Sequence, residues 1–241
     1  VREAACMALF RAGAKSKAPR LIEFALSEPD EQVQVAALYA LARLGVPDAF
    51  AVYEKFVADA DPYVRSLAVR GFGLSDNADA VRYLTIALND SDPRVVAQAI
   101  TDLAGKKTPE AMSRLAKKLG TVRDEKLKVA TINALARQQN AEALDAVNAV
   151  LSDGSPVNIT VAALGYLAAI QKERAIMLID SLQTLEDTEI RAACADAYAT
   201  IGTENIIPRL AVLFNDNSPL VRMSAFYGLV AIDSNNVTFY I

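Results

Sequence analysis

The feature that most constrains this 241-residue chain is an internal repeat of 31 or 32 residues. Each copy starts with an apolar anchor, which alanines and two more apolar residues follow. The anchors are Val1, Val33, Val64, Val95, Leu127, Ile159, Ile190 and Val221. A fixed period of this length is typical of stacked repeat proteins, in which each unit contacts mainly its neighbours. The period therefore predicts an elongated array of similar units.

The anchor half of each copy has the pattern of an α-helix. In the second copy, Ala37, Leu38 and Leu41 lie four, five and eight positions after Val33, which places them on one helical face. Three positions before each anchor stands a residue whose side chain can accept a hydrogen bond from the first turn. These capping residues are Asp30, Asp61, Asp92, Asp124, Asp187 and Ser218, with Ser155 one position out of register. We call this the B helix of each repeat.

The other half of each copy predicts a second helix, the A helix, with its own row of apolar residues. That row is Leu26, Val57, Leu88, Leu119, Leu151, Leu182 and Leu213. Very short turns join the two helices, so they should be antiparallel neighbours. Gly13, Gly45 and Gly202 stand where B helices should end in a left-handed residue. The predicted fold class is all-α, an α-solenoid of stacked antiparallel helix pairs.

The unbroken period predicts one repeat array over residues 1–241. The expected B helices lie near 1–12, 30–44, 61–73, 92–104, 124–137, 156–169, 187–200 and 218–231. The chain opens inside a B helix, and residues 235–241 match the beginning of a further A helix. Solenoids normally end in polar capping repeats, so we expect an array that is truncated at both ends.

The B-helix string D-P-x-V-R-x-x-A-x-x-x-L/F-x-x-L/I-G, as in DPYVRSLAVRGFG, resembles the HEAT repeat family. The short period is similar to that of the HEAT-like repeats of phycobilisome lyase subunits. The resemblance covers the whole chain, with Gln34, Val96 and Thr160 in place of the motif arginine. It implies a scaffold or adaptor whose B helices line a concave face, although a minority of such proteins are enzymes or enzyme subunits.

The residue inventory excludes several kinds of active site. The chain has no histidine, which removes Ser-His-Asp and Cys-His nucleophilic sites and most zinc or non-haem iron sites. Cys6 and Cys194 occupy core positions six repeats apart, roughly 50–60 Å at about 8–10 Å per helix layer, so a disulfide is not expected. We therefore predict no catalytic residue, no metal site and no cofactor.

The acids and arginines that recur with the period have structural explanations. Acids at the A-to-B turns, such as Asp59 and Asp61, fit helix capping better than a catalytic pair or a calcium site, because they repeat in successive copies. Asp61 and Arg65 are spaced as an i,i+4 pair, as are Asp124 and Lys128, and Asp187 and Arg191. In HEAT-like arrays such arginines also form ladders between repeats.

The outward positions of the B helices are the candidate partner surface. Tyrosine, arginine, methionine and small residues occupy them where a solvated face would carry lysine and glutamate, and this composition is enriched at protein interfaces. The candidate partner-binding residues are Arg11, Tyr39, Arg43, Arg70, Asn133, Arg137, Asp196 and Tyr227. The arginines predict a partner of acidic or mixed character near the N-terminal half.

We therefore expect a non-enzymatic scaffold or adaptor that binds a protein or peptide on its B-helix face. Two alternatives remain: a nucleic-acid-binding HEAT-like protein, and a lyase-type enzyme subunit. The sequence pI of about 5.0 and the absence of tryptophan count against nucleic acid. The longest apolar stretches, such as 161–170, are too short for the roughly 20 residues of a membrane span. A cytoplasmic location is favoured, and the oligomeric state is left open.

Overall fold

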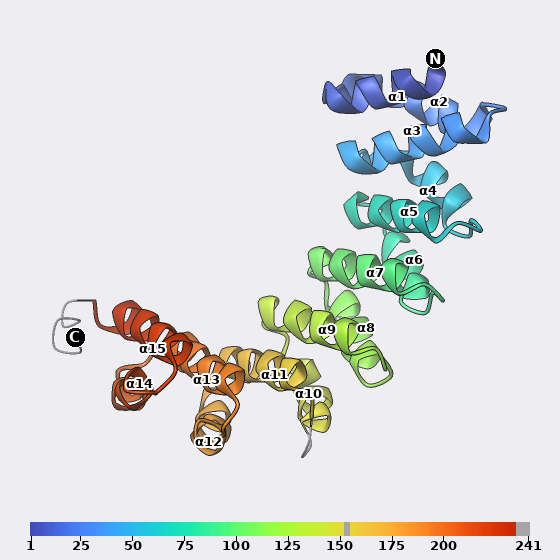
Figure 1. The fold of residues 1–241 in the computed structure, drawn as a ribbon. Coiled ribbons are helices and arrows are strands. Elements are labelled where there is room, and N and C mark those ends of the chain that lie inside the picture. The colour runs from blue at the N-terminus through green and yellow to red at the C-terminus, as the bar shows by residue number, and fades with distance from the viewer. Residues whose placement is uncertain (152–154, 235–241) are drawn as a thin grey trace. The chain divides into compact units, whose positions relative to one another are not determined.

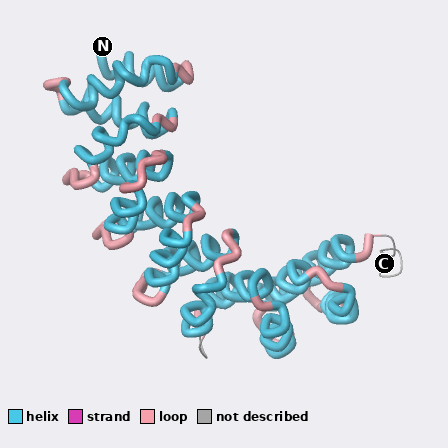
Figure 2. The backbone as a smooth tube through the Cα atoms, turned by 180° about the vertical axis from the view of Figure 1, so that it is seen from behind, coloured by secondary structure: helices cyan, strands magenta, loops and turns pink. Residues whose placement is uncertain are grey.

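The computed structural model describes residues 1–151 and 155–234. These residues form α-helices, short 3-10 helices and connecting turns, with no strand among them (Figures 1 and 2). The all-α helix-pair architecture predicted from the period is therefore confirmed. The A-helix start expected at 235–241 lies outside the described residues.

The two predicted helix rows both exist. The B helices are α1 (Arg2–Arg11), α3 (Glu31–Leu44), α5 (Pro62–Leu74), α7 (Pro93–Lys106), α9 (Glu125–Arg137), α11 (Val157–Ile170), α13 (Thr188–Ile201) and α15 (Pro219–Ile232). The A helices are α2 (Ala18–Ser27), α4 (Phe50–Phe56), α6 (Ala80–Ala87), α8 (Pro109–Leu119), α10 (Leu144–Val150), α12 (Lys172–Leu182) and α14 (Ile207–Phe214). Four of the A helices are entered through 3-10 turns: η1 (Lys15–Lys17), η2 (Pro47–Ala49), η3 (Ala141–Ala143) and η4 (Glu204–Ile206). Within the described ranges, no helix is both long and apolar enough to cross a bilayer.

The chain divides into two compact units, Val1–Leu115 and Ala116–Ile241, with α8 crossing the boundary. In unit 1 the B helices α1, α3, α5 and α7 pack one against the next, and α2, α4 and α6 form a second layer beside them (Figure 1). In unit 2 the B helices α9, α11, α13 and α15 pack in the same way, with α10, α12 and α14 in the second layer. Within each unit, every packed B helix buries its apolar stripe against its neighbours, as in an α-solenoid.

Aspartate side chains start most of the B helices as predicted. Asp30, Asp61, Asp92, Asp124 and Asp187 each accept a hydrogen bond from a backbone N–H of the first turn. The prediction is wrong for Ser218. It occupies the cap position of α15, but its side chain makes no capping hydrogen bond. Asp216 accepts a hydrogen bond from the Ser218 backbone N–H at 2.8 Å, as Asp59 does from Asp61, but this N–H precedes the first turn of α15. At α11 the cap position is Pro156, and the Ser155 hydroxyl donates instead to the Val150 carbonyl.

Small residues let the helices pack closely. Ala37, Ala68 and Ala99 are fully buried at the same position of successive B helices. Cys6 and Cys194 are buried free thiols, as predicted. Gly13, Gly45 and Gly202 follow B helices with φ of 62°, 65° and 66°, so the predicted left-handed helix ends are confirmed.

Candidate partner-binding site

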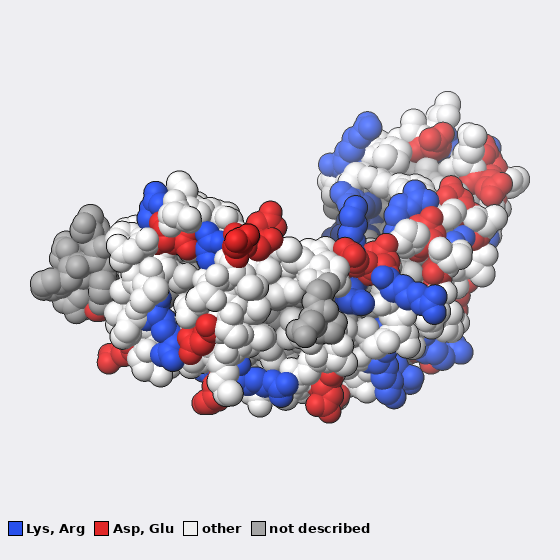
Figure 3. Space-filling view, turned by 60° about the horizontal axis from the view of Figure 1, so that its bottom comes forward, with Lys and Arg blue, Asp and Glu red and all other residues white. Residues whose placement is uncertain are grey.

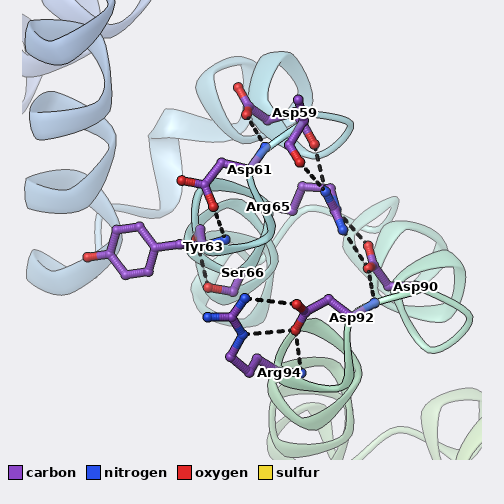
Figure 4. A network of polar contacts seen from close by, with 9 residues as sticks. Asp59, Asp61, Tyr63, Arg65, Ser66, Asp90, Asp92 and Arg94 are labelled. Carbon is purple, nitrogen blue, oxygen red and sulfur yellow. Dashed lines mark hydrogen bonds and ion pairs between the residues drawn. The ribbon is translucent and has the colours of Figure 1, made fainter.

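A ladder of arginines joins neighbouring repeats and holds the A-to-B turns in place. Arg65 on α5 makes a two-pronged ion pair with Asp90 of the next turn, with Nε–Oδ2 and Nη2–Oδ1 distances of 2.8 and 2.7 Å. Its remaining nitrogen, Nη1, donates to the carbonyls of Asp59 and Ala60 (Figure 4). Both charged side chains are only 13% exposed. The hydrogen bond from Arg65 is the main cause that lowers the pKa of Asp90.

The same ladder recurs elsewhere. In unit 2, Arg191 pairs with Asp216 and donates to the carbonyls of Leu185 and Glu186. In unit 1, Arg2 pairs with Glu28 at 2.6 Å. The predicted i,i+4 pairs of Asp61 with Arg65 and of Asp187 with Arg191 are therefore wrong, because each arginine reaches the following turn instead. The ladder between repeats that the HEAT resemblance implies is confirmed.

Where glutamine replaces the motif arginine, a lysine from the A layer completes the contact. Gln34 donates through its side-chain amide to the Glu28 carbonyl. Lys55 on α4 donates to the carbonyls of Ala25 and Leu26 and to the Gln34 side-chain oxygen at 2.8 Å. The turn before α3 is thus tied to α4 without an arginine.

The described surface of unit 1 contains a groove of about 700 Å³ across the N-terminal halves of α1, α3 and α5. Its floor is mainly apolar. The floor residues are Met7, Val35, Ala36, Tyr39, Tyr63 and Val64. The Tyr63 ring is 47% exposed and points away from the charged network of the neighbouring turn (Figure 4). We call this feature the unit 1 groove.

Carboxylates form the rim of the unit 1 groove. They belong to Glu3, Glu31, Asp59 and Asp61. One oxygen of Asp61 accepts the backbone N–H of Tyr63, and one oxygen of Asp59 accepts that of Asp61, both at 2.8 Å. Glu3 and Glu31 lie exposed in the first turns of α1 and α3. The positive ends of these helices stabilise negative charge at this edge.

Further along α1 and α3, an aromatic and arginine cluster continues the surface. Phe10 and Tyr39 pack edge to face with ring centroids 5.4 Å apart. The Arg43 guanidinium lies 5.9 Å from the Phe10 ring centre and 6.0 Å from that of Tyr39. Arg11 is exposed at the end of α1. The B-helix surface of unit 1 therefore runs from carboxylates at the helix starts to arginines at the helix ends.

Arg70, the fourth predicted residue of unit 1, lies beside the contact between α5 and α7. It is half-buried, and its charge lowers the pKa of Asp102 on α7. Burial is the larger effect and raises the pKa of Asp102 to about 7. Gly73 leaves room for this carboxyl group, because a Cβ at Gly73 would lie 2.3 Å from the Asp102 Cγ. Arg70 thus acts on a helix–helix contact as well as bordering the surface.

The other four predicted residues lie in unit 2, on α9, α13 and α15. Asn133, Arg137, Asp196 and Tyr227 lie at least partly open to solvent, Tyr227 by 64%. Among the described residues, no hydrogen bond or ion pair joins these four side chains to one another. They are separate points on the B-helix surface, whereas Tyr39 and Arg43 in unit 1 belong to one cluster.

Sequence reasoning missed several residues of the unit 1 groove. Tyr63 stands one position before its anchor, outside the columns of outward positions, although one helical turn brings that position onto the same face. Asp59 and Asp61 were explained as turn and capping residues, which they are, but they also form the rim. Extending the outward face by one helical turn toward the helix start would have found Tyr63, whereas Asp59 and Asp61 precede α5 and reach the groove only through the conformation of the turn.

The described residues hold no cluster of three or more Cys, Asp or Glu side chains able to bind a metal ion. Burial raises the pKa of the Cys194 thiol to about 12, and burial also raises that of Cys6. The reactive form of cysteine is the thiolate. Both thiols are therefore held in their unreactive form at neutral pH.

Comparison with known proteins identifies HEAT repeats in two stretches of the chain. A family model described as HEAT repeats matches residues 51–125, and a HEAT repeat model matches residues 206–235. The chain therefore contains HEAT repeats in these two stretches. No match was found among the curated proteins.

Known structures share this fold at low sequence identity. An engineered protein is 21% identical with a TM-score of 0.53, and the match covers 95% of this chain and 71% of the engineered chain. Kap95p in its complex with RanGDP is 15% identical (TM-score 0.59), covering 93% of this chain and 34% of its own. A homology model of the AP-3 complex is 17% identical with a TM-score of 0.61, and the match covers 92% of this chain and 46% of the AP-3 chain. The chain thus spans less than half the length of the latter two.

Proposed function

We propose that this HEAT-repeat chain is a non-enzymatic scaffold that holds a protein or peptide segment against its B helices, with the unit 1 groove as the main contact. The observation that carries the proposal is the groove itself. Tyr63 is 47% exposed on the floor of the groove, and Met7, Val35 and Tyr39 are half-buried there. Aromatic side chains in a concave, partly apolar site are the residues that most often dominate binding energy.

The ladder supports this role because it fixes the surface in advance. Arg65 ties the turn before α5 to the turn before α7, and Lys55 ties α4 to the turn before α3. A surface that is rigid before binding loses less conformational entropy when a partner arrives. The predicted residues Arg11, Tyr39, Arg43 and Arg70 extend the proposed surface along unit 1, and Asn133, Arg137, Asp196 and Tyr227 are proposed contacts in unit 2.

Charge supports a protein partner over nucleic acid. The formal net charge is −4, and the face seen in Figure 3 shows lysines and arginines interspersed with acids in each unit. Nucleic-acid binding draws on clustered positive charge that neutralises phosphates. The carboxylate rim of the unit 1 groove would repel phosphates.

Affinity capture with matched variants tests the proposal. The groove variant is Val35→Ala/Tyr63→Ala, which removes exposed floor atoms and leaves the ladder intact. The control is Ile86→Ala on the A helix α6, whose side chain is 60% exposed. We expect the groove variant to lose partners that wild type and the control both retain. Equal capture by all three proteins, with unchanged helicity, would remove the unit 1 groove as the contact surface.

A further inference from the structure

We propose further that the segment held in the unit 1 groove carries an apolar side chain next to a lysine or arginine. This inference rests on the proposed function and names the chemistry of the partner. Its basis is the combination of an apolar floor with a rim of one charge sign.

The floor sets the first requirement. Val35, Tyr39 and Tyr63 meet between α3 and α5, and Met7 adds a flexible side chain from α1. A volume of about 700 Å³ is larger than one side chain needs, and it lies within the range of small-ligand sites. An aliphatic or aromatic residue of a partner would cover these side chains and remove their apolar surface from water.

The rim sets the second requirement. Within the part of the chain that the structure describes, every charged residue that lines the groove is an acid: Glu3, Glu31, Asp59 and Asp61. Asp59 and Asp61 each use one oxygen for a backbone N–H, and an ionised carboxylate can accept several hydrogen bonds. The helix starts carry only partial positive charge, so the four carboxylates dominate the local field. Lysine and arginine are the donors that complement such a rim.

The arginines near the groove leave most of this field in place. Arg65 and Arg94 act on Asp59 and Asp61, but they are themselves ion-paired with Asp90 and Asp92. Arg43 lies beside Phe10 and Tyr39 near the end of α3, and it is not among the residues that line the groove. Twelve residues separate Glu31 from Arg43, about 18 Å along the helix at 1.5 Å per residue. That distance exceeds the screening length of about 8 Å at physiological salt. The basic group of the partner therefore belongs at the carboxylate edge.

Peptide binding to the whole chain tests the inference. The probes are fluorescent ten-residue peptides with a central leucine–phenylalanine pair, flanked by lysines, by serines or by glutamates. Anisotropy should give the tightest binding for the lysine peptide. At low salt it should bind on the order of 10-fold more tightly than the glutamate peptide, and the gap should shrink at high salt as exposed charges are screened.

Two charge variants locate the effect. Glu3→Gln/Glu31→Gln should roughly halve the free-energy preference for lysine, because it removes two of the four rim carboxylates. Glu23→Gln/Asp48→Asn makes the same change in net charge in α2 and η2, outside the groove lining, and should leave the preference intact. Circular dichroism should show all variants folded.

The possible results separate this inference from the proposed function. If Val35→Ala/Tyr63→Ala weakens peptide binding, but the lysine, serine and glutamate peptides bind wild type equally well, the inference fails and the proposed function stands. If binding ignores the groove variant, or if no peptide binds at about 1 mM, near the weakest measurable affinities, both fail. A preference for the glutamate peptide overturns the assigned chemistry.

Discussion

Replacing Gly71 with alanine tests how closely the two helix layers of unit 1 meet. Gly71 lies in α5, and a Cβ built on it would stand 2.3 Å from the Cδ1 and Cε1 atoms of Tyr53 on α4. Tyr53 is fully buried, and its hydroxyl donates to the Val46 carbonyl at 2.7 Å. The ring is thus held at both ends and cannot move aside without breaking that hydrogen bond.

The expected effect is a loss of stability, worked from opposing contributions. Alanine improves helix propensity over glycine by about 1 kcal/mol. Overpacking a core by one methyl group costs about 1–3 kcal/mol, and a buried group that loses its hydrogen-bond partner costs a further 1–3 kcal/mol or so. We therefore expect Gly71→Ala to lower the free energy of unfolding by about 3 kcal/mol.

Gly165 provides the matched control, because it also lies inside a B helix but has no neighbouring atom within 4 Å of the place that a Cβ would take. Gly165→Ala should stabilise the chain by up to about 1 kcal/mol. Gly228→Ala should change the free energy of unfolding by an intermediate amount, since its Cβ would lie 3.1 Å from side-chain atoms of Ala199 and Leu210. Urea unfolding followed by circular dichroism measures all three variants. Equal stabilisation by Gly71→Ala and Gly165→Ala would refute the proposed contact with Tyr53.

Three further predictions concern charge and thiol chemistry. Asp90→Asn should lower the free energy of unfolding, measured with urea, by about 2–3 kcal/mol, because it leaves the largely buried Arg65 without its anion. A decrease below about 0.5 kcal/mol, which is typical of an exposed ion pair, would contradict this. Asp102 has its pKa raised to about 7 from 3.8, so the native state holds a proton that the unfolded state releases, and stability should fall as pH rises from about 4 to 7. In the Asp102→Asn variant, the melting temperature should no longer fall between about pH 4 and 7. A variant whose melting temperature depends on pH as in wild type would contradict this role of Asp102. Cys6 and Cys194, both buried thiols with raised pKa values, should resist iodoacetamide at pH 7 until urea unfolds the chain; rapid native labelling would contradict their burial.

Local patterns were enough to predict the helices. The anchor spacing and the aspartate caps both depend on contacts within one or two turns, so Asp30 and Asp61 mark helix starts before any packing is known. The left-handed ends at Gly13 and Gly45 follow from the same kind of local constraint. Ser218 shows the limit, because it occupies the predicted cap position of α15 but its side chain makes no capping hydrogen bond.

Contacts between repeats were harder to predict. The spacing of Asp61 and Arg65 satisfies the rule for a pair on one helix, yet Arg65 reaches Asp90 in the next turn. Which partner wins depends on how the repeats stack, and spacing along one helix carries no information on that. The groove is also a product of stacking: Tyr63 and Val35 come from different repeats and become neighbours only when α3 and α5 pack.

Site-specific photo-crosslinking tests the central claim most directly, that the unit 1 groove is the contact surface for a protein partner. A benzophenone amino acid is placed at Tyr63 in the groove, and in a second protein at Ile86 on α6. Each folded protein is irradiated with the lysine-flanked peptide or with the partner recovered by affinity capture. We predict a crosslinked product from position 63 and none from position 86. Crosslinking from position 86 alone would contradict the claim.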